Sequence, residues 1–177
     1  MSEYQEQKRT RPAIDVLAAR LLDEPLQREV LAFVQFLREN RLSAQWASTN
    51  SYKVSDHSRG VCLIKLAEQS YQLWLNTQYD EAFNACFSQA DESIKQYLMK
   101  NMVYCSGCGT CKPGLNVEVL GAAQRAACVH PVIRMANPDP ALQELAKQLV
   151  LLRKQAIREG KVPKVSYVAM KKREKVL

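Results

Sequence analysis

The strongest constraint on this chain is a cysteine-rich window at residues 104–130, which holds four of the six cysteines. Cys105, Cys108 and Cys111 follow one another in the spacing C-x2-C-x2-C, and Cys128 comes later in the same window. Three glycines beside the first three cysteines allow tight backbone turns. Cysteines clustered in an intracellular protein are more often metal ligands or redox groups than disulfide partners. We therefore interpret the window as a Cys-rich knuckle around a metal ion.

Zinc is the metal that this ligand pattern favours. A structural zinc site takes four ligands at the corners of a tetrahedron, and two cysteines separated by two residues can reach one ion from a single turn. Cys105, Cys108, Cys111 and Cys128 would complete such a site. His130 could replace one of the thiolates, since it lies two residues beyond the last cysteine. The expected cofactor is a zinc ion with these ligands.

An iron–sulfur cluster is the alternative cofactor for the same cysteines. The C-x2-C-x2-C spacing resembles the start of the cysteine run in bacterial ferredoxins, where a fourth cysteine and a proline complete the pattern. Here Lys112 and Pro113 follow Cys111, and no cysteine completes the run nearby. A distant fourth ligand, Cys128, is compatible with a single cluster. A metal-free reactive dithiol is the third possibility, but Gly109 favours a loop where a reactive cysteine would need a helix N-terminus.

Known catalytic motifs are missing from the sequence. Catalytic zinc keeps an open position and commonly uses histidine and carboxylate ligands, whereas four thiolates would close the site. The chain has two histidines and no H-E-x-x-H motif, and it lacks the glycine-rich nucleotide-binding motifs. We therefore expect a non-enzymatic binding or regulatory protein. The alternatives are a redox protein on the same cysteines and a small-molecule-binding domain with its pocket between strands and helices.

The positive charge is concentrated in the C-terminal part of the chain. The net charge is +7, but residues 1–111 hold 12 Lys+Arg against 13 Asp+Glu, which is −1. Residues 112–177 hold 13 against 5, which is +8. Such asymmetry is typical of a solvated surface that keeps a protein soluble, and the alternative is nucleic acid or an acidic protein as a partner of the basic C-terminal half.

The N-terminal residues and the hydrophobic content place the chain in the cytoplasm. No apolar run approaches the roughly 18 residues of a membrane-spanning helix. The first residues are polar and lack the basic and apolar regions of a secretory signal. We expect a cytoplasmic protein that does not enter a membrane.

Hydrophobic periodicity predicts a single α+β domain over residues 1–177. The first eleven residues are polar and are expected to fray. A helical hairpin follows, with one helix from Pro12 and the next from Pro25, because apolar residues recur there at helical spacing. Three short strands then predict an antiparallel meander, at 51–55, 61–66 and 71–75. Its aromatic residues, Trp46 and Trp74 among them, are expected in the core, as is the thiol of Cys62.

The second half alternates between helices, the knuckle and strands. The expected elements are helices at 80–87 and 91–102, a short strand at 117–120, a stretch at 122–127 that fits helix or strand, and a long helix from Pro140 to Gly160. Asp91 and Asp139 are the expected caps. Cys86 is expected to face the core. The long helix has four cations opposite its apolar stripe, which predicts a basic outer surface, and a basic tail at 161–177 is expected to be mobile or to add a strand.

Overall fold

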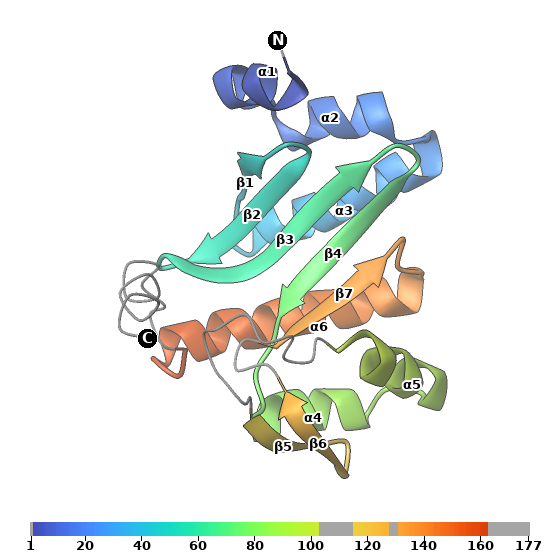
Figure 1. Cartoon of the computed structure of the whole chain (residues 1–177), viewed down its shortest axis with the longest axis vertical. Coiled ribbons are helices and arrows are strands. Elements are labelled where there is room, and N and C mark those ends of the chain that lie inside the picture. The colour runs from blue at the N-terminus through green and yellow to red at the C-terminus, as the bar shows by residue number, and fades with distance from the viewer. Residues whose placement is uncertain (1, 103–114, 128–130, 163–177) are drawn as a thin grey trace.

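The computed structural model describes residues 2–102, 115–127 and 131–162, and it is an α+β structure (Figure 1). These residues form six helices, a five-stranded antiparallel sheet and a two-stranded sheet. In chain order the elements are α1 (Glu3–Thr10), α2 (Ile14–Leu21), α3 (Glu24–Glu39), β1 (Ala44–Ser48), β2 (Ser51–Asp56), β3 (Arg59–Ala67), β4 (Ser70–Asn76), α4 (Glu81–Ser88), α5 (Glu92–Asn101), β5 (Leu115–Val119), β6 (Ala122–Ala127), β7 (Val132–Ala136) and α6 (Pro140–Arg158).

The main sheet contains the predicted meander and two further strands. Its order is β1-β2-β3-β4-β7, so β2, β3 and β4 pair as predicted. The sequence did not predict β1 and β7, which pair with the two outer strands of the meander. β7 is separated in sequence from its partner β4 by two helices, the knuckle window and the small sheet. Its pairing depends on tertiary contacts that a local pattern does not contain.

One face of the main sheet forms the core. Tyr52, Ile64, Leu73 and Met135 lie opposite one another on four neighbouring strands, and each is 1% exposed or less. Burying a side chain of this size contributes about 1.5–3 kcal/mol relative to leaving it in water. α2, α3 and α6 contact the sheet, and α3 and α6 pass behind it in Figure 1. The helices therefore cover one face, and the opposite face is turned toward the viewer.

The N-terminal segment is a helix, which corrects the prediction that it frays. Ser2 begins α1 with a capping box: its hydroxyl accepts from the Gln5 N–H at 3.3 Å, and the Gln5 side-chain oxygen accepts from the Ser2 N–H at 3.1 Å. Gln7 is 3% exposed and joins α1 to the turn between β1 and β2. The predicted two-helix hairpin is thus a group of three helices, because polar contacts hold a segment that has few apolar side chains.

The predicted start and end of the long helix are confirmed. The Asp139 carboxylate accepts from the Leu142 N–H at 2.8 Å, and Pro140 occupies the first turn of α6. Gly160 follows the helix with φ of +73°, a conformation that glycine adopts without strain. Asp91 stands at the N-cap of α5 as predicted, but its side chain makes no capping hydrogen bond.

Three of the four cations that predict a basic outer surface on α6 bond to other parts of the protein. Arg153 donates to the carbonyls of Gly60 and Thr77 at 3.2 and 3.1 Å. Lys154 donates to the Asn40 carbonyl, and Arg158 pairs with Asp56 at 3.2 Å. These side chains satisfy carbonyls and a carboxylate at the ends of α3 and of the strands, so they attach α6 to the rest of the molecule.

A smaller lobe contains α4, α5 and the β5–β6 hairpin. The ambiguous stretch at 122–127 is a strand, and it pairs with β5 through the two-residue turn Leu120-Gly121. Both turn residues have positive φ, +54° and +73°, as hairpins of this length require. The predicted strand at 117–120 overlaps β5.

The two cysteines within the described residues lie in different environments. Cys62 is 3% exposed, and burial raises the pKa of its thiol to about 12, so the predicted buried thiol is confirmed. Cys86 is half-buried against the core, and its thiol donates to Gln148 at 3.5 Å. In the described part of the chain, no helix combines the length and apolar character that crossing a bilayer requires.

Candidate functional site

The predicted metal ligands lie outside the described residues. This holds for Cys105, Cys108, Cys111, Cys128 and the possible substitute His130. The structure does describe the residues at which the two ligand-bearing segments begin and end. Those flanking residues set where the chain enters and leaves each segment.

The two segments, 103–114 and 128–130, connect the same two places in the fold. At one place Met102, at the end of α5, forms an antiparallel bridge with Ile133 of β7, and both side chains are buried. At the other place Leu115 of β5 pairs with Ala127 of β6. Strand pairing therefore holds the chain ends that bound the two segments as two pairs, one at Met102 and Ile133 and the other at Leu115 and Ala127.

Chain length limits how far the cysteines can lie from these paired ends. An extended chain spans about 3.3–3.6 Å per residue. In sequence, Cys128 follows Ala127 directly and Cys111 comes four residues before Leu115, so both are close in the chain to the paired ends of β5 and β6.

The described residues offer no competing metal site. Within 2–102, 115–127 and 131–162, no group of three or more His, Cys, Asp and Glu side chains is arranged to hold a metal ion. Cys62 and Cys86 belong to the sheet and to α4, respectively.

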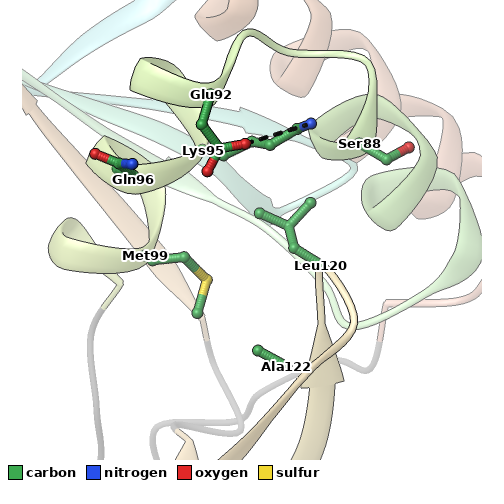
Figure 2. A pocket seen from close by; sticks show the side chains of 7 residues that line it. All are labelled: Ser88, Glu92, Lys95, Gln96, Met99, Leu120 and Ala122. Atoms are coloured by element: carbon green, nitrogen blue, oxygen red, sulfur yellow. Dashed lines mark ion pairs between the residues drawn. The ribbon is translucent and has the colours of Figure 1, made fainter.

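A pocket of about 510 Å³ lies beside the knuckle's flanks, between α5 and the β5–β6 hairpin (Figure 2). Its lining residues are Ser88, Glu92, Lys95, Gln96, Met99, Leu120 and Ala122. Glu92 and Lys95 form an ion pair at 4.0 Å on the helical side. Met99 and Leu120 supply apolar surface. Such a pocket suits a small ligand with an apolar body and a polar or charged group.

This pocket is not where the sequence placed one. The expected position was between the meander and its helices, but core side chains from both layers pack there. A second hollow of about 320 Å³ shares Ser88 and Leu120 with the first and continues along the turn of the hairpin. The small lobe, rather than the main sheet, therefore carries these two hollows.

One arrangement on the open face of the main sheet was not predicted from the sequence. Trp74 was expected in the core, but it points to the face opposite the helices and is half-exposed. The Lys65 ammonium lies 3.8 Å from the centroid of its ring, and the Arg134 guanidinium carbon lies 4.1 Å from it. The alternation around Trp74 in β4, between buried Leu73 and Leu75, was the signal that could have placed it outward.

Comparison with known proteins gives no relative from which to transfer a function. No protein-family model matches the chain, and neither a curated protein nor a solved structure is significantly similar to it. The function is therefore argued from the residues.

Proposed function

We propose that this chain is a non-enzymatic binding or regulatory protein with a structural zinc site. The ligands would be Cys105, Cys108, Cys111 and Cys128, with His130 as a possible substitute. The single observation that carries the proposal is the pairing of the flanks, because it joins the two cysteine-bearing segments at both of their ends. An iron–sulfur cluster on the same four cysteines is the alternative.

Zinc would supply stability where the sequence supplies little core. Polar residues, glycines and cysteines dominate the knuckle, and a loop of this size cannot bury enough apolar surface to fix itself. Four thiolates carry a net negative charge around a zinc ion. Lys112 and Arg125 are basic neighbours in sequence, and such neighbours favour the thiolate form and offset this charge.

The test is elemental analysis with a visible spectrum on untagged protein purified without oxygen. We expect one zinc ion per chain and no colour. Cys111→Ser should lower the zinc content, whereas Cys86→Ser, a half-buried cysteine outside the knuckle, should leave it unchanged. Iron together with sulfide and a broad visible absorption band would show that the cofactor is an iron–sulfur cluster and not zinc. Protein without any metal would overturn both assignments and leave a dithiol to explain.

The pocket beside α5 favours a second candidate function, the binding of a small molecule. A ligand there would contact both α5 and the β5–β6 hairpin. Its binding would therefore stabilise the elements that flank the knuckle. Met99→Trp should fill the apolar part of the pocket and abolish the thermal shift given by a metabolite that binds there. A shift that survives Met99→Trp would place the ligand elsewhere.

The proposed partner of the basic C-terminal half is nucleic acid or an acidic protein. In the described part of α6, Arg153, Lys154 and Arg158 are bonded within the protein. Among the described residues of this half, Arg125 of β6 and Arg134 of β7 are exposed cations that form no ion pair with a described carboxylate, and the tail adds the run Lys171-Lys-Arg-Glu-Lys175 in sequence. Binding that falls steeply with added salt would support this partner, and its absence at low salt would overturn it.

A further inference from the structure

The face of the main sheet turned away from α2, α3 and α6 has a distinct chemistry. We call it the outer sheet face and define it by Lys53, Leu63, Lys65, Gln72, Trp74 and Arg134. All six side chains are exposed or half-exposed. In Figure 1 this face is the one seen in front of α3 and α6.

Strand register places four of these residues in one row. Lys53 pairs with Leu63, Leu63 with Trp74, and Trp74 with Arg134. Neighbouring strands lie about 4.7–4.9 Å apart, so the row from β2 to β7 is about 14 Å long. It presents a cation, an apolar side chain, an aromatic ring and a second cation in that order.

Trp74 lies between cations that come from the strands on either side of it. Lys65 belongs to β3 and Arg134 to β7, and both lie within 4.1 Å of the ring centroid. The indole N–H donates to the Gln72 side-chain oxygen at 2.8 Å, which fixes the ring on the sheet. The ring and the guanidinium therefore form a preorganised stack on an open surface.

The cations of this face keep their charge for a partner. In the described part of the chain, Lys53, Lys65 and Arg134 form no ion pair with a carboxylate. Asp56, at the end of β2, is engaged by Arg158 of α6 on the helical side. Glu68 lies in the β3–β4 turn, beyond the row. The face thus combines positive charge with aromatic and apolar surface.

We infer that the outer sheet face binds single-stranded nucleic acid. Single strands are held by cations on the phosphates and by bases stacked on aromatic rings or arginine planes, and this face supplies both. The ring of Trp74 and the guanidinium plane of Arg134 are the surfaces of this face on which a base can stack. A duplex is a poorer fit, because the face has no helix or ribbon that projects into a groove. An acidic protein would use the cations but would have no need of the stack at Trp74.

The inference deepens the partner part of the proposed function and rests on it, but it is independent of the metal. It specifies the outer sheet face, and not the tail, as the surface that binds. It also specifies a single strand as the nucleic acid that is bound. If only the tail binds nucleic acid, the proposed partner holds and this inference fails. If nothing binds, both fail.

Fluorescence anisotropy on the full chain tests the inference, with a labelled oligothymidine of about ten nucleotides as the probe. We expect binding at about 50 mM salt that weakens strongly by about 200 mM. Trp74→Leu should weaken binding about tenfold through lost stacking. Arg134→Gln should weaken it severalfold and reduce the salt slope by about 0.7, the amount for one phosphate contact on a single strand.

Arg28→Gln is the matched control for charge, because Arg28 is an exposed cation on α3, on the helical side. It should bind like the wild type. A variant with Lys171, Lys172 and Arg173 changed to Gln separates the tail from the sheet. Circular dichroism of each variant confirms that it is folded.

Three results would overturn the inference. One is full binding by Trp74→Leu and Arg134→Gln with loss in the tail variant, which would assign the contact to the tail. Another is equal affinity for a duplex of the same length or for an oligoglutamate peptide, which would indicate a general polyanion site or an acidic protein partner. The third is no binding of the single strand at about 50 mM salt.

Discussion

The structural role of Gln7 could not be predicted from the sequence. Its side-chain oxygen accepts from the Asn50 N–H at 2.8 Å and from the Trp46 indole N–H at 3.2 Å. Its amide nitrogen donates to the Asn50 and Glu3 side chains. A glutamine in a polar N-terminal stretch looks solvated, yet this one is buried and satisfies groups from β1 and the following turn.

Replacement of Gln7 by leucine should destabilise the fold. The donors on Asn50 and Trp46 would lose their acceptor in a buried place, which costs about 1–3 kcal/mol. Urea unfolding measures the loss. Gln35→Leu, at an exposed glutamine of α3 bonded to Glu39, should change stability by no more than about 0.5 kcal/mol. Equal effects of the two variants would contradict the role assigned to Gln7.

Tyr52 should make stability fall at alkaline pH. Burial, and then the negative charge of Asp15, raise the pKa of Tyr52 from its ordinary value of 10.0 to about 12. The unfolded chain therefore ionises first, so this contribution is fully present below pH 10 and is lost as pH rises toward 12. The Tyr52 hydroxyl also donates to the Pro12 carbonyl at 2.8 Å, an interaction that needs the protonated form.

Urea unfolding between about pH 9 and pH 11 tests this dependence. Tyr52→Phe should show a shallower decline of stability with pH than the wild type. Some decline should remain, because burial also raises the pKa of Tyr71 and Cys62. A Tyr52→Phe slope identical to the wild type would refute the assignment.

Among the elements, α6 depends on its first turn. Asp139→Ala removes the acceptor of the Leu142 N–H and should lower stability by about 1 kcal/mol. Asp91→Ala is the natural comparison, because Asp91 occupies the same position in α5 without a capping hydrogen bond. Its loss should be clearly smaller in thermal or urea unfolding. Equal losses would mean that charge near the helix end, and not the hydrogen bond, accounts for the stabilisation.

The elements that could be predicted are those whose own sequence carries a complete signal. α3 and α6 have an acidic cap, a proline in the first turn and a regular apolar stripe. β2, β3 and β4 alternate buried and exposed residues between short turns. α1, β1 and β7 lack such signals. Gln7 holds α1 in place, β1 pairs with β2 at the edge of the sheet, and β7 pairs with β4 across a long sequence separation.

At the scale of the molecule, removal of the proposed zinc should leave most of the fold intact. The buried residues of the main sheet, α2, α3 and α6 pack against one another, so most contacts of the core lie outside the knuckle. A chelator should therefore change the far-UV circular dichroism only slightly. Amide hydrogen exchange should quicken in β5 and β6, whose paired ends flank the cysteines. Global unfolding on chelation, as in a zinc finger, would contradict the prediction that the main sheet and its helices stay folded without the metal.

The candidate sites differ in how far the sequence could define them. Cysteine spacing is a local property, so Cys105, Cys108 and Cys111 could be named as ligands without a fold. The pocket beside α5 and the stack of Lys65, Trp74 and Arg134 combine residues from separate elements. The pocket depends on the hairpin and the stack depends on β7, and the positions of both elements follow from strand pairing and not from composition.

The bridge between Met102 and Ile133 has a consequence for how this chain could be rebuilt. Met102 and Ile133 are paired although residues 103–132 separate them in sequence. The residues between them are therefore an insertion between two adjacent points of the fold. A four-residue linker of glycine and serine from Met102 to Pro131, whose carbonyl accepts from the Thr77 N–H, would keep β7 in register. The knuckle would then be an exchangeable module, and the remaining scaffold could carry a different one.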